Sequence, residues 1–285
     1  MKHAYLILAH DAFGLLQTLI GCLDDERNDI YVHIDRKVKR LPELHAEKAG
    51  LRILSERIDI RWGDYSMVEA EYALFGAAAA GGPYRYYHLL SGVDLPLKSQ
   101  DYIHRFFETH DGKEFVGYTL TEMTPELVRR MQRWHGFPRH FSRRRNGYSL
   151  VRAIGIRAQE ALGIRRNRDI DFKKGSQWVS ITDGLVRWLL SRKDDARKIF
   201  THTFVPDECF VQTLAWHSPF RAKLYDTEDD GKGCMRAIGW RGDRLMDWSA
   251  ADLETLSASS ALFARKFNSS DPVFLQKIVS LSVNI

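Results

Sequence analysis

Short apolar runs and longer amphipathic segments alternate through the first 120 residues, and this alternation constrains the fold more than any other feature of the chain. Strands are predicted at residues 3–9, 29–35, 51–56, 85–92 and 114–119. Helices are predicted between them at residues 13–23, 66–80 and 99–110. Because strands that alternate with helices form a mostly parallel sheet with helices on both faces, the sequence predicts an α/β fold.

The second half of the chain repeats this pattern less regularly. A strand is expected at residues 175–182, a helix at 183–192, a helix that starts at Pro206, and a late strand at 234–240. No internal repeat, low-complexity tract or linker interrupts the 285 residues. We therefore expect a single domain over residues 1–285 with a surface insertion at about 129–168.

The expected insertion is strongly basic. Residues 129–168 hold twelve arginines and one acid, Glu160, so this segment carries a formal charge of +11 within a chain whose net charge is +5, and the rest of the chain carries −6. Such an asymmetry indicates an anionic partner: nucleic acid, a phospholipid surface or a phosphorylated substrate. The segment also predicts a basic amphipathic helix with one apolar face, formed by Leu150, Val151, Ile154, Ala158, Ala161 and Leu162.

Cysteine usage and hydropathy bear on the compartment. The three cysteines, Cys22, Cys209 and Cys234, are odd in number and widely separated, which disfavours a disulfide scaffold and fits a reducing compartment. The apolar run at the N-terminus is interrupted by His10 and Asp11 and is a poor signal peptide. No run reaches the roughly 18 to 20 apolar residues of a membrane span. We expect a cytoplasmic protein.

Several enzyme classes lack their motifs here. There is no G-x-G-x-x-G after the first strand and no G-x-x-x-x-G-K-[ST], so dinucleotide oxidoreductases and P-loop enzymes are disfavoured. Neither G-x-S-x-G, H-E-x-x-H nor C-x-x-C occurs, which disfavours serine hydrolases and zinc enzymes. An α/β sheet with acids at its strand ends and no P-loop suits a nucleotide-sugar transferase of the GT-A type.

Ligands of such sheets bind beyond the carboxyl ends of the strands, where His10, Asp35 and residues 91–94 are expected. Asp35 would hydrogen-bond a nucleoside there, or simply cap a turn. Metal-using GT-A enzymes carry Asp-x-Asp at a central strand end, whereas the corresponding "LLSGVDLPLKS" has one acid, Asp94. The literal "DID" at residues 169–171 is interpreted as a solvated loop.

Without a metal, a leaving diphosphate needs fixed cations, and the candidates are Arg236 and the neighbouring pair Arg265 and Lys266. We therefore expect neither a metal nor another cofactor. In "TFVPDECFVQT", Pro206 and the acids after it have two interpretations. They form an ordinary helix start, or Glu208 shares a helix stripe with Gln212 and Trp216, faces a cleft and acts as a general base.

Seven segments, in order from residue 4 to residue 268, resemble the core-2/I-branching family of β-1,6-N-acetylglucosaminyltransferases and their xylosyltransferase relatives, glycosyltransferase family 14. They are "AYLILAH", "YVHIDRK", "RWGDYSMVEAEYAL", "HLLSGVDLPLKS", "GSQWVSIT", "TFVPDECFVQT" and "LFARKFN". The resemblance implies a GT-A-like fold, a UDP-sugar donor, inversion at the anomeric carbon and no metal requirement.

Carried over by position, the resemblance implies that Asp35 contacts uracil or ribose, that Glu208 is the catalytic base, and that Arg236 and Lys266 neutralise the diphosphate. We assign His10 to the donor side as well, and Asp94 and Trp178 to the acceptor side or the cleft. The chain departs from the animal members in lacking their membrane anchor, their disulfide-forming cysteines and a clear counterpart of their acceptor-gripping aromatics, and resembles shorter bacterial members instead.

The leading hypothesis is an inverting, metal-independent transferase that moves GlcNAc, or alternatively xylose, from a UDP-sugar to a glycan hydroxyl in bacterial surface polysaccharide assembly. Its acceptor would be lipid-linked at the inner face of the membrane, with residues 129–168 on anionic headgroups.

The first alternative is a nucleic-acid-binding protein that uses residues 129–168, with arginines at 143–145 and 165–168 beside Trp134, Phe137 and Phe141. It explains none of the strand-end residues. A glycosidase is less favoured, because Asp207 and Glu208 are adjacent and should diverge rather than flank one bond at roughly 5 to 9 Å.

Overall fold

The computed structural model describes residues 1–141, 147–242 and 244–283. Its main sheet has the strand order β3-β2-β1-β4-β6, in which β3, β2, β1 and β4 are parallel and β6 pairs antiparallel with β4. The strands are β1 (His3–Ala9), β2 (Asn28–Ile34), β3 (Gly50–Ile53), β4 (Tyr86–Ser91) and β6 (Ser180–Thr182). The prediction of a mostly parallel α/β sheet is confirmed.

The central strand β1 is buried along its whole length, which explains its nearly continuous apolar sequence. Successive side chains of a strand point to opposite faces. Ala4, Leu6 and Leu8 accordingly pack into the core on one face. Tyr5, Ile7 and Ala9 pack into a second core on the other. The sheet therefore needs helices on both sides.

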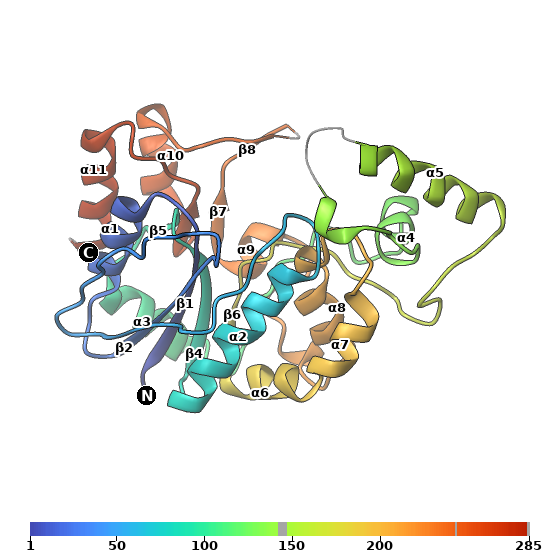
Figure 1. Ribbon diagram of the computed structural model, residues 1–285. Helices are drawn as coiled ribbons and strands as arrows, with labels where there is room; N and C mark the ends of the chain where they lie inside the picture. Colours follow the sequence, from blue (N-terminus) through green and yellow to red (C-terminus); the bar gives the residue numbers. More distant parts are fainter. Residues whose placement is uncertain (142–146, 243, 284–285) are drawn as a thin grey trace.

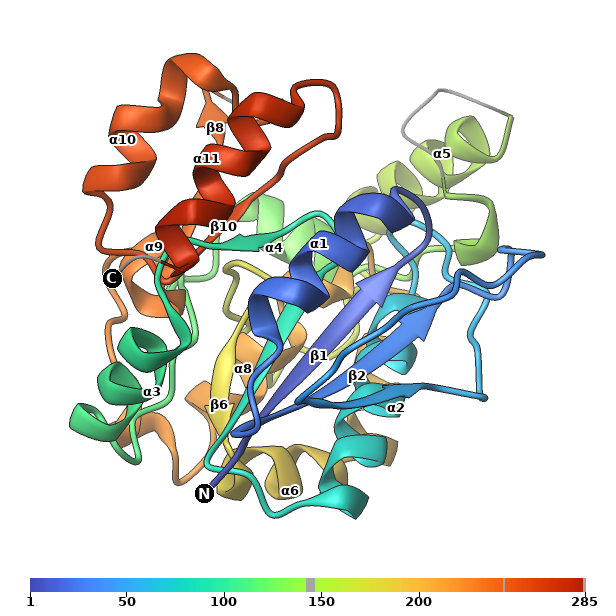
Figure 2. The ribbon, with the colours of Figure 1, turned by 90° about the vertical axis from the view of Figure 1, so that its left-hand side faces the viewer.

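Helices cover both faces, as predicted (Figures 1 and 2). The core that contains Leu6 is formed with side chains of α2 (Ser66–Gly81), α6 (Asp183–Ser191), α7 (Lys193–Phe200) and α8 (Phe210–Trp216). The core that contains Ile7 is formed with side chains of α1 (Phe13–Leu23), α3 (Gln100–Thr109), α10 (Leu253–Ala258) and α11 (Pro272–Val283). The helices expected at 13–23, 66–80, 99–110 and 183–192 all form within two residues of the predicted bounds.

A second, smaller sheet adjoins the first. In it β10 (Phe263–Arg265) lies parallel to β7 (Arg236–Ile238) and antiparallel to β5 (Leu95–Pro96). A hairpin of β8 (Trp240–Arg241) and β9 (Arg244–Leu245) and the short helix α9 (Asp230–Cys234) complete this part. The expected strand at 234–240 is shortened to β7, and β10 has no counterpart among the predictions because three residues carry no readable periodicity.

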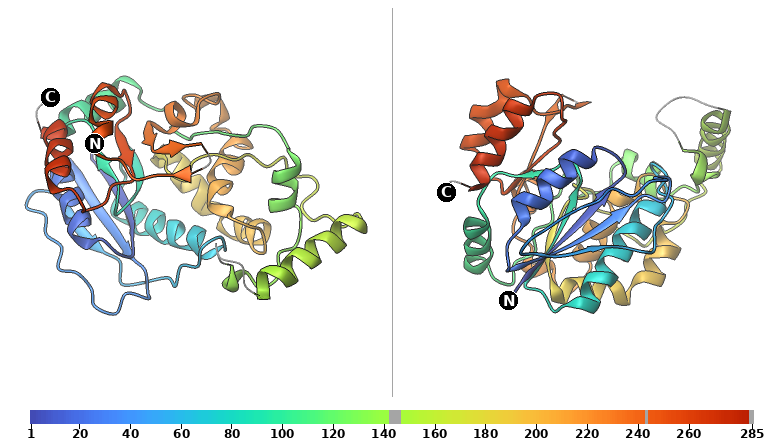
Figure 3. Two further views of the ribbon diagram at one scale, coloured as in Figure 1. Left: turned by 90° about the horizontal axis from the view of Figure 1, so that it is seen from above. Right: turned by 60° about the vertical axis from the view of Figure 1, so that its left-hand side comes forward.

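The arginine-rich part of the chain forms α4 (Pro125–Met131) and α5 (Gly147–Ala161). We call residues 125–141 and 147–168 the arginine lobe. In Figures 1 and 3, α5 stands away from the sheet, with α4 nearer the body. The predicted helix with Leu150, Val151 and Ile154 is confirmed. Among the described residues, no helix combines the length and apolar character that crossing a bilayer requires.

Two predicted strands and one helix need correction. Residues 114–119 form two single bridges, Glu114 with Leu224 and Phe115 with Ser180, so no continuous ladder develops there. At 175–182 only the last three residues are a strand. Pro206 begins a 3-10 helix (Pro206–Glu208), and Cys209, at φ −128°, separates it from α8. The other 3-10 helices are Pro138–His140, Arg221–Lys223 and Ala250–Asp252.

Candidate active site

Backbone hydrogen bonds bring the ends of β1, β2 and β4 together. The amide of Asp35 donates to the carbonyl of Ala9 (2.9 Å), and the amide of Gly92 donates to Leu8 (2.9 Å). The amide of Phe267 donates to the carbonyl of Val93 at the same distance, 2.9 Å. His10, Asp35, Asp94 and Lys266 therefore follow chain segments that adjoin at the carboxyl edge of the sheet, as the sequence predicts.

Asp35 is buried, and its carboxylate accepts hydrogen bonds from the amide (2.8 Å) and Nζ (2.6 Å) of Lys37. The first bond caps the turn after β2, which confirms the alternative interpretation of this residue. A nucleoside contact stays a prediction. His10 is exposed, and its Nε2 lies 3.3 Å from Oδ2 of Asp11.

Asp94 and Trp178 are brought together by Arg265. Asp94 is fully buried and accepts hydrogen bonds from the amide (2.9 Å) and Oγ (2.5 Å) of Ser91 and from Nε of Arg265 (3.2 Å). The guanidinium of Arg265 lies 4.2 Å from the centre of the Trp178 ring. A carboxylate on one side and an indole face on the other fix the direction of this arginine.

Arg236 lies buried below the carboxyl edge of the sheet and not on its surface. It is 2% exposed, and its guanidinium donates to the carbonyls of Cys234 (2.7 Å) and Val179 (3.1 Å) and to Oγ of Ser180 (3.0 Å). Burial lowers the pKa of Arg236 to about 10. Lys266 is partly exposed, with Nζ 2.9 Å from Oδ1 of Asp247.

Glu208 is held from the arginine lobe. Oε2 of Glu208 accepts a hydrogen bond from Nη2 of Arg130 (2.9 Å), and the same arginine donates to the carbonyls of Val205 (2.9 Å) and Phe204 (3.3 Å). The Glu208 side chain is 36% exposed, and among the described residues its Oε1 has no hydrogen-bond partner. One oxygen is thus fixed and the other is open.

The proposed stripe of Glu208, Gln212 and Trp216 does not form. Gln212 is buried, and its Nε2 donates to the carbonyl of Ser176 (2.6 Å). The break at Cys209 rotates Glu208 away from the helix that carries the other two. Glu208 reaches the surface because the 3-10 turn ends there.

Two further acids lie behind Glu208. Glu71 on α2 is fully buried, with Oε1 accepting from Nε2 of Gln177 (2.7 Å) and Oε2 without a hydrogen-bond partner. Burial raises the pKa of Glu71 well above its ordinary value, and the charge of Asp207 adds to the effect. Burial, with the charge of Glu208, raises the pKa of Asp207 to about 7. Both shifts favour the protonated form of these acids, and Asp207 is about half protonated near pH 7.

Residues 175–179 connect the two parts of the site. The amide of Gly175 donates to the carbonyl of Glu208 (2.9 Å), and the side chain of Gln177 donates to Glu71. The ring of Trp178 packs against the guanidinium of Arg265. The segment runs alongside β4, where the amide of Leu89 donates to the carbonyl of Val179 (2.9 Å). One continuous segment therefore links Glu208 to the edge that holds Asp94.

Three residues of this arrangement escaped the sequence analysis as site residues: Arg130, Glu71 and Gln177. Glu71 had a usable pattern, because it lies three residues after Val68 and four before Phe75, on the apolar face of the predicted helix. Arg130 is one of twelve arginines in its segment, and nothing in the sequence distinguishes it.

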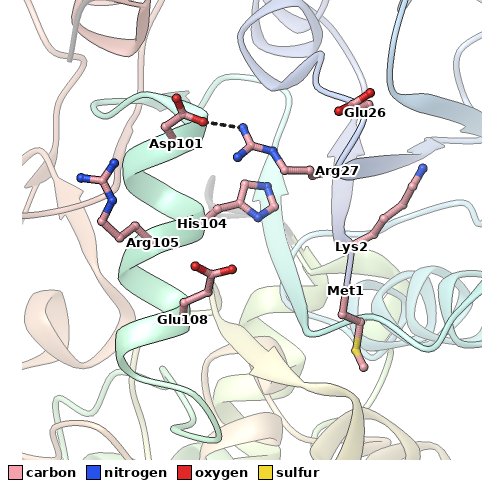
Figure 4. A pocket seen from close by; sticks show the side chains of 8 residues that line it. All are labelled: Met1, Lys2, Glu26, Arg27, Asp101, His104, Arg105 and Glu108. Atoms are coloured by element: carbon pink, nitrogen blue, oxygen red, sulfur yellow. Dashed lines mark hydrogen bonds and ion pairs between the residues drawn. The ribbon is translucent and has the colours of Figure 1, made fainter.

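A hollow of about 680 Å³ lies at the opposite end of the sheet. Figure 4 shows the side chains that line it. The hollow is lined by Met1, Lys2, Glu26, Arg27, Asp101, His104, Arg105 and Glu108. Arg27 and Asp101 are paired at 2.7 Å, and the three cations are balanced by three acids. Because it lies at the amino ends of the strands and has no net charge, this hollow is not the candidate site for an anionic donor.

No three His, Cys, Asp or Glu side chains in the described ranges come together as a metal site. In the "DID" segment, Oδ2 of Asp171 accepts from Nζ of Lys173 (2.6 Å). Metal use is not tested by these observations, and metal independence stays a prediction.

The chain matches a known protein family over nearly its whole length. Residues 3–277 match the Core-2/I-branching enzyme family. The chain belongs to this family. Membership confirms the resemblance found in the sequence, and the mostly parallel sheet with helices on both faces fits the GT-A-like fold that the resemblance implied. The match includes the whole carboxyl edge and the arginine lobe.

Individual relatives are distant. Xylosyltransferase 2 of Mus musculus is 23% identical over 292 residues, which cover 94% of this chain and 32% of that protein. Xylosyltransferase 2 of Canis lupus familiaris is 22% identical with the same coverage. Xylosyltransferase sqv-6 of Caenorhabditis briggsae is 21% identical over 270 residues, 87% of this chain and 31% of that protein. The chain spans about a third of the length of these curated relatives.

Proposed function

We propose that this member of the Core-2/I-branching enzyme family transfers a sugar from a UDP-sugar to a glycan hydroxyl, with inversion and without a metal. The family match and the relatives named as xylosyltransferases support a glycosyltransferase. GlcNAc and xylose are the two candidate sugars. Surface polysaccharide assembly at the inner face of a bacterial membrane, on a lipid-linked acceptor, is the proposed setting.

The observation that carries the proposal is the partly exposed carboxylate of Glu208, fixed through one oxygen by Arg130. Oε1 is in position to take the proton of an acceptor hydroxyl. As the oxygen of the acceptor hydroxyl bonds to the anomeric carbon and its proton passes to Oε1, the bond from carbon to diphosphate breaks, and UDP leaves with the electron pair. A single displacement of this kind inverts the anomeric centre.

The donor would lie along the carboxyl edge. Asp35 and His10 are proposed for the nucleoside, and Lys266 for the diphosphate, after it exchanges Asp247 for the ligand. Arg236 is too buried to reach a phosphate in this arrangement, so its contribution is the positive potential of a charge beneath the edge. Arg265, 16% exposed at the same edge, adds to that potential.

Asp94 and Trp178 act on the site through Arg265. Asp94 is fully buried and Trp178 is 5% exposed, which supports a positioning role for both in place of direct contact with the acceptor. Removing Asp94 would leave the guanidinium without its carboxylate and free to change direction.

The nucleic-acid alternative has weaker support. Of its three aromatics, Phe141 packs edge-on against Phe204, and Trp134 stacks on His202 at 4.9 Å. Arginines 143–145 lie outside the described residues. Surface aromatics already paired within the protein present less area on which bases stack.

The test combines donor binding with transfer. Melting temperature is measured with UDP, UDP-GlcNAc, UDP-xylose, UDP-glucose and ADP, each with EDTA and with manganese, and transfer is followed by UDP release. A UDP-selective rise that survives EDTA, and is lost in Lys266→Ala but kept in the exposed-lysine control Lys277→Ala, supports the proposal. A rise that requires manganese contradicts metal independence, and no rise with any UDP compound contradicts the donor assignment.

A further inference from the structure

Helix α5 exposes the side that a helix of a globular protein normally buries. Its protein-facing side holds Ile156, which is buried, and the partly buried Arg152 and Gln159. The predicted apolar face points outward instead, with Ile154 59% and Leu162 73% exposed. Leu150, Val151 and Ile164 are also at least half exposed. An exposed apolar stripe of this length marks a site of interaction.

Specific contacts hold α5 in this orientation. The guanidinium of Arg152 lies 4.4 Å from the ring centre of Phe204 and 4.7 Å from that of Phe141. The side chain of Gln159 accepts from the amide of Trp134 (2.8 Å) and donates to its carbonyl (2.9 Å). Turning the apolar face inward would break all of these contacts. The outward face is therefore a fixed feature of the fold.

Cations border the exposed apolar face. Arg157 on α5 itself, and Arg165 and Arg168 just beyond it, are exposed. The aromatic rings of Phe137 and Tyr148, about half exposed, pack against each other at 5.6 Å at the start of α5. An apolar face bordered by arginines and amphipathic rings is the pattern of a helix that lies in a lipid interface.

We propose that the outward face of α5 docks on a bilayer with anionic headgroups. The formal charge of +11 over residues 129–168 complements such a surface. A second copy meeting face to face would bring two of these segments together and repel. Nucleic acid would use the arginines but would leave the aliphatic side chains of Leu150, Ile154 and Leu162 in water.

Docking orients the site, and this step rests on the proposed function. Gln159 ties α5 to Trp134, just beyond α4, and Arg129 of α4 lies 3.4 Å from Glu160 of α5. The next residue of α4, Arg130, holds Glu208. A membrane under α5 therefore touches the lobe whose Arg130 holds the proposed catalytic carboxylate, which suits an acceptor carried on a lipid.

The test is flotation of the full chain with two kinds of vesicle, phosphatidylcholine alone and phosphatidylcholine with 30% phosphatidylglycerol, a probe composition of about one anionic lipid in three. We expect binding to the anionic vesicles only. It should fall at least tenfold in Leu150→Ser/Ile154→Ser/Leu162→Ser, because the apolar contact is lost. Val273→Ser, which changes an apolar residue of similar exposure (65%) on α11, is the matched control and should bind like the wild type.

Charge is tested separately with Arg157→Glu, which should weaken binding, against Arg105→Glu on α3, which should not. Equal binding to both vesicle types, or unchanged binding by the triple serine variant, would overturn the proposal. So would a concentration-dependent dimer that the triple variant abolishes, or oligonucleotide binding unaffected by that variant. Glu208→Gln should float normally and lose transfer, so a failure of docking and a failure of the proposed function are distinguishable.

Discussion

Helices α2 and α5 both carry several large apolar side chains, and the structure buries those of one helix and exposes those of the other. In α2, Val68, Leu74 and Phe75 are fully buried against the sheet. In α5 only Ile156 is buried, while Ile154 faces water. The two helices differ in their surroundings along the chain. Helix α2 connects strands β3 and β4 of the main sheet, whereas α5 lies in a segment with a formal charge of +11. Spacing predicts that a helix has an apolar face, and the neighbouring charges indicate what that face meets.

The largest expected difference between these helices is in folding stability. Phe75→Ala should lower the free energy of unfolding by about 3 to 5 kcal/mol, because it empties a packed core position. Ile154→Ala should change it by no more than about 0.5 kcal/mol, because most of the side chain is already exposed to water. Urea denaturation of both variants measures this. A large loss in Ile154→Ala would mean that α5 packs against the body in solution.

The next largest loss of folding stability is expected where Arg130 of the arginine lobe contacts the rest of the protein. Arg130→Met removes the hydrogen bonds to Glu208, Val205 and Phe204 and should cost about 1.5 to 3 kcal/mol. The neighbouring Arg129→Met, which removes an exposed ion pair with Glu160, should cost less than about 1 kcal/mol. Equal effects in urea denaturation would show that α4 is not anchored through Arg130.

These contrasts also mark what the sequence predicts and what it does not. The order of strands and helices follows from local periodicity, so three of the four parallel strands and four helices are predicted within one residue at each end, and β3 ends three residues before its predicted end. The bridges at 114–119 and the three-residue strand β10 depend on distant partners that no local pattern specifies. The same limit applies to the site. Asp35 and Asp94 are found from their strand ends, whereas the pairing of Arg130 with Glu208 depends on two segments 78 residues apart.

The acid Asp207 is expected to make the free energy of unfolding depend on pH, with a smaller effect than the substitutions above. Asp207 has a pKa of about 7 in the fold, against an ordinary value of 3.8, so the folded state holds the proton more tightly than the unfolded state. Its contribution to stability is therefore complete below about pH 4 and is lost as the pH rises through about 7. Relative to Asp207→Asn, the wild type should lose on the order of 1 kcal/mol between pH 5 and pH 8, since partial exposure screens the effect.

Denaturation curves of the two proteins at both pH values measure this difference. A wild type that gains stability over Asp207→Asn with rising pH would contradict the sign. Glu208→Gln should shrink the difference, because the charge of Glu208 is the second cause of the raised pKa of Asp207.

The smallest stability effect is expected at the exposed end of the donor edge. Asp247→Asn removes the partly exposed ion pair with Lys266 and should change the free energy of unfolding by less than about 1 kcal/mol. The freed lysine should bind UDP more tightly, as measured by titration calorimetry. Weaker UDP binding in this variant would argue that Asp247 itself contacts the donor.

The central claim is that Glu208, fixed by Arg130, is the catalytic base. Its most direct test is the rate of transfer from the preferred UDP-sugar in Glu208→Gln, beside Glu126→Gln, which alters another acid that pairs with the same arginine. Glu208→Gln should lose about 10²- to 10⁴-fold in rate while keeping its UDP-induced rise in melting temperature, and Glu126→Gln should stay close to the wild type. Transfer by Glu208→Gln at the wild-type rate would contradict the account.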